Sequence, residues 1–354
     1  MSYRSGFLVV VALTAGVAAA FGYTGGWFSP HRLGPQRMIA ALEAAGGVHP
    51  GFRRNHAKGL CVTGYFDSNG AGARLSKAVV FASGRVPVVG RLALAGGQPF
   101  QPDAARTTRS FALRFTLPDG EEWRTGMNAI PVFPFRTPRA FYEQLVASRP
   151  DPATGKPAPR RMAEFLGAHP ETARALKVLG DQPVSSGFAD STFNSLDAFR
   201  FVAATGASVP VRWALVPIQA FSADESAAAG SRAPNYLFDA VVTTLQHQPL
   251  QWHLVVTIAQ PGDPTNDATQ AWPADREQVD IGTLTIDHAQ GEDGGACRDI
   301  NFDPLVLPSG IEPSDDPLLS ARSAAYARSF TLRAGETKAP SAVQTAPAAG
   351  GDRP

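Results

Sequence analysis

The sequence has little cysteine and almost no excess of charge. Its 354 residues include two cysteines, and 32 Lys and Arg stand against 31 Asp and Glu, which gives a formal net charge of +1. Two cysteines exclude a small domain stapled by disulfides and a zinc module built on cysteine ligands. The balanced charge argues against a nucleic-acid-binding protein, because binding to phosphates needs a basic face that releases counterions.

Charged residues are scarce overall. They make up 18% of the chain, below the usual ~25% of a globular protein. Apolar residues make up 44%, which is ample for a packed core. The 34 glycines and 30 prolines imply many turns, but they stay below the roughly 25–30% typical of disordered chains. The composition therefore predicts a globular, loop-rich protein of one large domain or two average ones.

The first 28 residues predict an export signal. One basic residue, Arg4, precedes the apolar run Phe7–Phe21, and Ala18–Ala20 supplies the small residues of a cleavage site. The alternative is a retained membrane anchor with Tyr23 and Trp27 at the interface, although the run is shorter than the ~20 residues of a usual span. Both interpretations place the rest of the chain outside the cytoplasm, which in a bacterium means the periplasm.

Export affects the interpretation of Cys61 and Cys297. An oxidising compartment permits a disulfide, but the two residues lie far apart in the sequence, which does not show whether they meet. We expect two unpaired, buried, small apolar side chains, and the disulfide stays open as the alternative.

Beyond the N-terminal segment, strands joined by turns dominate. Ser110–Thr116 alternates in the manner of a half-buried strand, and Pro118-Asp119-Gly120 forms the turn of a hairpin to Glu121–Thr125. Further strands are expected at residues 59–66, 78–82, 86–94, 198–203, 209–217, 253–259 and 278–287. Helices are expected at residues 35–45, 138–148, 160–168, 171–179, 236–247 and 315–332.

This order of elements predicts an α+β fold. We expect a closed antiparallel β-barrel of about eight strands with inserted and C-terminal helices, because closure removes exposed strand edges. The barrel domain is expected to span residues 29–334. The polar, low-complexity residues 335–354 are expected to form a disordered tail.

Three segments hold unusual sets of polar residues. They are Arg53–Gly59 (RRNHAKG) before a strand, Met127–Arg136 (MNAIPVFPFR) after the hairpin, and Arg322–Tyr326 (RSAAY) on the last helix. Arg322 and Tyr326 share a helix face because they are four residues apart, and Arg333 follows about two turns later. The guanidinium groups favour the phenolate form of Tyr326, which is an anionic ligand able to hold haem iron.

These motifs resemble those of the haem catalase family, and within it the small catalase-related peroxidases. Arg53 with His56–Gly59 matches the family's distal motif R-x-x-H-A-K-G, and the segment that begins at Asn128 resembles its asparagine segment. Residues 301–314 (NFDPLVLPSGIEPS) lead into R-x-x-x-Y as they do in that family. The resemblance extends over residues 35–333.

The resemblance implies a role for each matching residue and a haem (heme b) cofactor with its iron. Tyr326 would be the metal ligand, Arg322 would hold it as phenolate, His56 would be the catalytic acid–base, and Asn128 would hydrogen-bond the peroxide. The remaining cofactor-binding residues are Phe141, which would stack over the haem, and Arg53, Arg91 and Arg333, which would bind its propionates.

Two positions depart from the family pattern. The family has a serine two residues after the arginine that matches Arg91, bonded to the distal histidine, and this chain has Ala93 there. Where full catalases have a histidine four residues after the ligand tyrosine, this chain has Phe330. We also expect the protein to lack the C-terminal domain and the long N-terminal arm of large catalases. We therefore expect other groups to orient His56 and catalase turnover to be weak.

The implied function is reduction of hydrogen peroxide or organic hydroperoxides in defence against oxidative stress, with at most weak catalase activity. The expected partners are a peroxide and a small-molecule electron donor, without nucleic acid, and membrane contact through the N-terminus stays open. We expect a monomer or dimer rather than a catalase-type tetramer. Two alternatives remain: a haem barrel that isomerises lipid hydroperoxides, and a non-enzymatic barrel that binds an apolar ligand.

Overall fold

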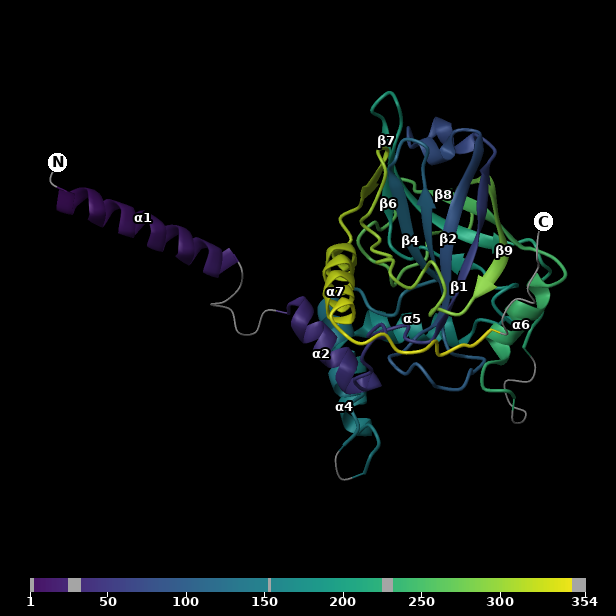
Figure 1. Ribbon diagram of the computed structural model, residues 1–354, viewed down its shortest axis with the longest axis horizontal. Coiled ribbons are helices and arrows are strands. Elements are labelled where there is room, and N and C mark those ends of the chain that lie inside the picture. The colour runs from purple at the N-terminus through teal and green to yellow at the C-terminus, as the bar shows by residue number, and fades with distance from the viewer. Residues whose placement is uncertain (1–2, 25–32, 152–153, 225–231, 346–354) are drawn as a thin grey trace.

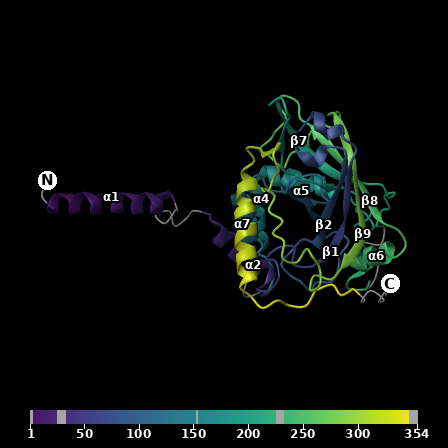
Figure 2. The ribbon, with the colours of Figure 1, turned by 45° about the horizontal axis from the view of Figure 1, so that its top comes forward.

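A computed structural model describes residues 3–24, 33–151, 154–224 and 232–345 of the chain. Helix α1 (Tyr3–Thr24) stands apart from the rest of the protein in both views (Figure 1, Figure 2). Its segment Gly6–Tyr23 is long and apolar enough to cross a membrane, and 6% of it is buried. Trp27 and the expected end of the export signal at residue 28 lie outside the described residues.

The body is built around a closed antiparallel β-barrel. The strands are β1 (Gly59–Ser68), β2 (Gly84–Leu94), β3 (Arg109–Thr116), β4 (Glu122–Asn128), β5 (Phe193–Asn194), β6 (Phe199–Val202), β7 (Ser208–Pro217), β8 (Leu250–Ile258), β9 (Gln278–Gln290) and β10 (Ile311–Pro313). Within the described residues the ring runs β7-β5-β4-β3-β2-β1-β9-β8, and pairing of β8 with β7 closes it. β5 and β6 pair with successive parts of the same edge of β7, and β10 pairs with β6. The predicted α+β barrel is confirmed.

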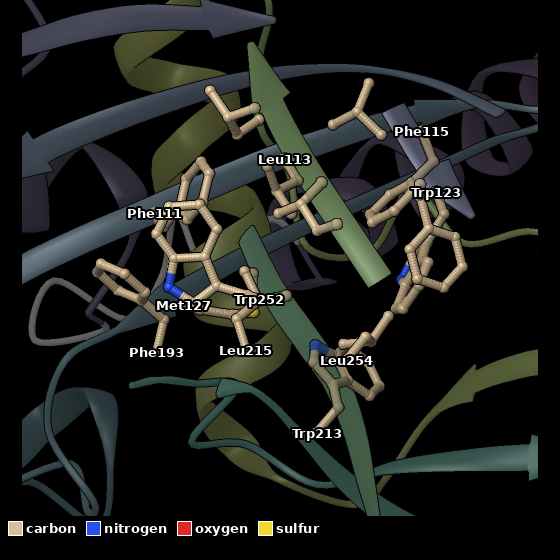
Figure 3. Close-up of a cluster of buried hydrophobic side chains, with 14 of the residues drawn as sticks. Phe111, Leu113, Phe115, Trp123, Met127, Phe193, Trp213, Leu215, Trp252 and Leu254 are labelled. Atoms are coloured by element: carbon tan, nitrogen blue, oxygen red, sulfur yellow. The ribbon is translucent and has the colours of Figure 1, made fainter. Parts of the chain in front are cut away.

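Large apolar side chains fill the inside of the barrel. Figure 3 shows them pointing toward one another from opposite walls. The residues labelled there include Phe111, Leu113, Phe115, Trp123, Met127, Trp213 and Trp252, all of them buried. Because successive residues of a strand point to opposite faces, Ser110, Ala112, Gly126 and Asn128 lie on the outer face of the same wall. The polar motifs are therefore on the outside of the barrel.

The helices lie around the barrel. After α1 they are α2 (Pro35–Gly46), α3 (Pro138–Ala147), α4 (Pro159–Ala168), α5 (Pro170–Gly180), α6 (Tyr236–Leu245) and α7 (Pro317–Ala334). Proline occupies the first turn of α2, α3, α4, α5 and α7, where an N–H has no partner inside the helix. Helix α7 runs along one side of the barrel and packs against α2 and α3 (Figure 2).

Two segments differ from the expectations. Residues 78–82 are not a strand: Val79–Phe81 forms the short 3-10 helix η2, and a second one, η1 (Ala71–Arg74), precedes it. Residues 335–345, expected to be disordered, cross the base of the barrel from α7 toward the end of β9 (Figure 2). Val343 is buried in the main core there, and Gly291 donates to the hydroxyl of Thr345. Residues 346–354 of the expected tail lie outside the described part.

The expectation of unpaired cysteines is wrong, because Cys61 and Cys297 form a disulfide. Cys61 lies on the outer face of β1, and Cys297 lies in the segment between β9 and β10. Both are buried, as expected, in a small apolar cluster with Ile300 and Phe302. The closed barrel brings together two residues that the sequence separates by 236 positions.

Candidate active site

The three polar segments converge on the outer face of β1–β4. Val89 of β2 and Ala112 of β3 form an apolar part of this face, and they pack on the cluster of the disulfide together with Tyr326 of α7. The wall therefore has two uses: its inner side chains make the barrel core, and its outer side chains line a space bounded by α7. This arrangement unites segments separated by more than half of the chain.

His56 lies in the turn before β1 and has an unusual backbone. Its φ is 54°, in the left-handed region that a residue with a side chain seldom adopts. Arg91 donates from Nη1 to the carbonyl of His56 at 2.8 Å, and the His56 N–H donates to Oδ1 of Asn55 at 3.0 Å. Asn55 Oδ1 also accepts from the Gly96 N–H at 3.0 Å. These bonds hold the turn and aim the imidazole at the outer wall.

The surroundings keep the imidazole of His56 neutral. Burial lowers its pKa to about 3, and the positive charges of Arg91, Arg322 and Arg53 act in the same direction. The ring therefore carries no charge at neutral pH, and one of its nitrogens is free to accept a proton.

Asn128 and His56 meet through a serine that the sequence interpretation missed. Ser110 Oγ lies 3.0 Å from Nδ1 of His56 and donates to Oδ1 of Asn128 at 2.5 Å. The strand register explains this contact, because Ser110 is paired with Ala93 of β2 on one side and with Asn128 of β4 on the other. The sequence signal for it was the alanine at position 93, which left His56 without the serine that the family places there.

Tyr326 and Arg322 face the same wall from α7. A Cβ built on Gly126 would lie 3.4 Å from the Tyr326 hydroxyl and 3.4 Å from Nη2 of Arg322, which is ordinary van der Waals contact, so both groups pack close to the backbone at Gly126. Arg322 donates to the carbonyl of Gly126 at 3.2 Å and forms an ion pair with buried Asp197. Asp197 is a second partner that sequence reasoning did not supply.

Two of the three arginines expected at the propionates, Arg53 and Arg91, pair with one carboxylate. Glu292, which is buried, accepts from Arg53 at 2.6 Å and from Arg91 at 2.8 and 2.9 Å. Arg53 also donates to the carbonyls of Cys297 and Ile300, and Arg91 to those of His56 and Ala57. Arg333 donates to the carbonyl of Arg298. Glu292 was not predicted, because nothing in its local sequence marks it as a partner.

The donor set fits an anionic cofactor such as haem. Burial and the neighbouring Arg91 lower the pKa of Arg53 and of Arg333, whereas Glu292 acts in the opposite direction on both. Arg333 Nε is buried and has no hydrogen-bond partner within the described residues. Arg53 and Arg91 share one carboxylate, and the charge of Arg333 also acts on it, so a further acidic group would compensate the excess positive charge. A pocket of about 230 Å³ lies beside Arg333, but it is lined by Arg298, Phe330 and Lys338 and not by His56, Asn128 or Tyr326.

Phe141 lies on α3, away from the hydrogen-bonded residues described above. Its ring packs at 5.2 Å from that of Phe135 and at 6.0 Å from that of Phe133, both in the asparagine segment. It also belongs to the cluster in which Ala325, next to Tyr326 on α7, packs against α2 and α3. The structure thus connects Phe141 with the second and third segments, and its stacking on haem stays a prediction.

Comparison with known proteins identifies the family. The family model named Catalase matches residues 51–346, well over half of the chain. The chain belongs to the catalase family. A catalase-related peroxidase of Synechococcus elongatus is 37% identical to it over 319 residues, which cover 90% of this chain and 94% of the relative. A catalase-related peroxidase of Mycolicibacterium paratuberculosis is 35% identical over 306 residues, which cover 86% and 96%.

Solved catalase structures share the fold. The protein matches a bacterial catalase with a TM-score of 0.69 at 21% identity and a fungal catalase with a TM-score of 0.71 at 19% identity, each over 80% of this chain. This catalase-family chain spans 58% and 59% of the length of those two catalases. It spans nearly all of the two related peroxidases.

Proposed function

We propose that this catalase-family chain is a haem-dependent peroxidase that reduces hydrogen peroxide or organic hydroperoxides, with at most weak catalase activity, in defence against oxidative stress. Membership in the family makes it an oxidoreductase that acts on peroxide. One observation carries the proposal: His56, Ser110 and Asn128 are hydrogen-bonded on the outer wall that Tyr326 approaches at Gly126.

Haem dependence is typical of the family, and we propose that Tyr326 holds the iron with Arg322 beside it. When bound, haem supplies a redox-active iron that accepts the oxidising equivalents of peroxide and passes them to an electron donor. The unpartnered Nε of Arg333 favours this residue for a propionate. Arg53 and Arg91 keep the region positive, and Phe141 would cover the haem face.

His56 is the proposed acid–base. Cleavage of the O–O bond requires that one peroxide oxygen loses a proton and that the departing oxygen gains one. A neutral imidazole does both in turn, and the lowered pKa of His56 keeps it neutral before the reaction. Asn128 does not titrate near neutral pH, so it holds the peroxide without competing for the proton.

The preference for peroxidase over catalase activity rests on the relatives. Those that are 35% and 37% identical carry the name catalase-related peroxidase, whereas a relative named catalase, from rat, is 27% identical over 295 residues, 56% of its length. Ala93 no longer argues for weak turnover, because Ser110 provides a hydroxyl to His56. The electron donor is proposed to be a small molecule, and the protein to be a monomer or dimer.

We also propose that the enzyme works outside the cytoplasm. The support is the apolar helix α1, which stands apart from the body with exposed Phe7, Leu8 and Leu13. The protein is then either a periplasmic protein released by cleavage of the signal or a protein tethered to the membrane by a retained anchor. Fractionation of cells, with the N-terminus of the mature protein sequenced, distinguishes them, and a purely cytoplasmic protein would contradict both.

Two substitutions test the proposed function. Tyr326→Phe should abolish stable haem binding and the haem absorption bands, whereas Tyr142→Phe, on α3, should change neither. His56→Ala should keep haem bound but lower the rate of peroxide cleavage by at least ~100-fold, within the usual range for acid–base catalysis. A Tyr326→Phe protein with an unaltered spectrum, or a His56→Ala protein with unaltered turnover, would refute the assignment.

A further inference from the structure

Ser110 occupies a position between the two distal residues, on a strand where the family pattern does not place it. Its hydroxyl has a single proton, and that proton goes to Oδ1 of Asn128 at 2.5 Å. The contact with Nδ1 of His56 at 3.0 Å must then be one in which Ser110 Oγ accepts. Nδ1 therefore carries the ring proton, and the lone pair of the neutral ring is on Nε2. The backbone of Leu94 is a further hydrogen-bond partner of this ring.

The same chain of bonds fixes the amide of Asn128. A side-chain amide has one acceptor oxygen and one donor NH₂ group. Because Oδ1 accepts from Ser110, Nδ2 points away from the serine. On the strand edge away from Ser110, Asn128 is paired with Asn194 of β5. The side-chain amide of Asn194 donates to the carbonyl of Ile130 at 3.0 Å. Nδ2 of Asn128 thus remains a donor for a ligand.

We propose that Ser110 is a positioning residue that sets the polarity of both distal groups, so that His56 presents an acceptor at Nε2 and Asn128 presents a donor at Nδ2 to one peroxide. The inference rests on the proposed function for the identity of the ligand. A peroxide has oxygens that donate as well as accept, and it matches this pair of groups in one orientation. In a reversed chain Nε2 of His56 would carry the ring proton and Asn128 would present Oδ1, so no acceptor would be available at Nε2.

The strand register shows why one residue can do both tasks. Residues directly opposite on neighbouring strands have Cβ atoms about 4.5–5.5 Å apart, and Ser110 is directly opposite both Ala93 and Asn128. A hydroxyl at position 93 would be separated from Asn128 by the full width of β3, roughly 9–10 Å over two strand spacings. It would reach His56 but not Asn128. Moving the hydroxyl across one strand therefore keeps the contact with His56 but removes the bond to Asn128.

The experiment compares four full-length variants. Ser110→Ala removes the hydroxyl, Ser110→Thr retains it, and Ala93→Ser/Ser110→Ala moves it to the neighbouring strand. Ser76→Ala is the matched control, because Ser76 is also buried and its hydroxyl donates to the carbonyl of Gly310 at 2.8 Å, outside the site. The readouts are the tautomer of His56, from nitrogen-15 NMR of histidine-labelled protein before haem is added, the rate of peroxide cleavage after haem is added, and the midpoint of thermal unfolding. His56→Ala identifies the signal of His56.

In the wild type and in Ser110→Thr we expect the Nδ1–H tautomer of His56. Ser110→Ala should give a mixture of tautomers and a rate about 10- to 100-fold lower, the range seen when a group that orients a metal ligand is removed. The relocated serine should leave a mixture of tautomers and a low rate, because it reaches His56 but cannot give its proton to Asn128. Ser76→Ala should alter stability at most.

Two results would overturn the proposal. One is a single unchanged tautomer in Ser110→Ala with a wild-type rate. The other is a loss of rate in Ser110→Ala with an unchanged tautomer and a loss of stability equal to that of Ser76→Ala, which is what a purely structural serine would give. If instead the tautomer responds as expected while His56→Ala keeps full activity, the positioning role stands and the proposed function fails.

Discussion

The disulfide between Cys61 and Cys297 gives the protein a stability that depends on redox conditions. It closes a loop of 236 residues, and the chain-entropy relation for a loop of that length gives about 5.5 kcal/mol at 25 °C. Measured contributions are commonly about 2–4 kcal/mol, so the calculated value is a ceiling. The substitution Cys61→Ala/Cys297→Ala removes the cross-link at the cost of little volume, since both side chains are small. We expect the free energy of unfolding to fall by about 2–5 kcal/mol.

The assay is unfolding in guanidinium chloride followed by circular dichroism, for wild type and double variant, each with and without dithiothreitol. The reductant should lower the midpoint of the wild type to near that of the variant and leave the variant unchanged. That comparison separates the cross-link from the small cavity made by the alanines. Two titratable thiols in the purified wild type, or equal midpoints for all four samples, would refute the reasoning.

Three further predictions concern the site. Burial holds the pKa of His56 at about 3 in the folded protein, whereas in the unfolded chain His56 takes up a proton near pH 6.5. The free energy of unfolding should therefore fall by up to about 1.4 kcal/mol per pH unit as the pH falls from about 6.5 toward 3. Between about pH 6 and 5 the free energy of unfolding should thus fall more steeply for the wild type than for His56→Ala, and equal slopes would contradict the pKa. Glu292→Gln removes the buried carboxylate that two arginines share and should lower the free energy of unfolding by about 3–5 kcal/mol; an unchanged denaturation midpoint would show that the carboxylate is not needed there. The branched side chain of Gly126→Val should displace Tyr326, because a Cβ at that position already lies in contact, 3.4 Å from the Tyr326 hydroxyl. We expect reduced haem content with unchanged circular dichroism for Gly126→Val and wild-type haem content for Gly126→Ala, and full haem content in Gly126→Val would contradict this.

Local chemistry predicted most elements of the fold. Alternation identified β3, and the Pro-Asp-Gly turn located the hairpin to β4, where Gly120 has a φ of 86°. The five apolar residues 78–82 were misassigned because a short buried run has no period that distinguishes a strand from a helical turn; Phe81 reaches the core from a 3-10 helix instead. Strands as short as β5 and β10 have too few residues to show a pattern at all.

Residues whose partners are distant in the sequence limited the prediction of the site. The motif residues could be named from the sequence, because each lies in a recognisable local segment. Ser110, Glu292 and Asp197 could not, since their partners are fixed by strand register, by the closure of the barrel and by the docking of α7. The disulfide belongs to the same group. Composition likewise could not show that residues 335–345 dock, because a few contacts such as those of Glu336 with Arg54 and with the N–H of Gly51 suffice to hold them.

The two-sided wall of β3 and β4 couples the chemistry to the folding of the chain. Phe111 and Met127 face inward, and their neighbours Ser110 and Asn128 face outward. A shift of either strand by one residue would therefore turn its core side chains outward and its active-site side chains into the barrel. A misregistered chain would expose aromatic side chains and bury the polar pair without partners, which makes it both unstable and inactive. A variant with a single-residue insertion or deletion in these strands should therefore lose its fold together with its activity. Packing of the aromatic core thus ensures that the active-site residues are on the correct face of the sheet.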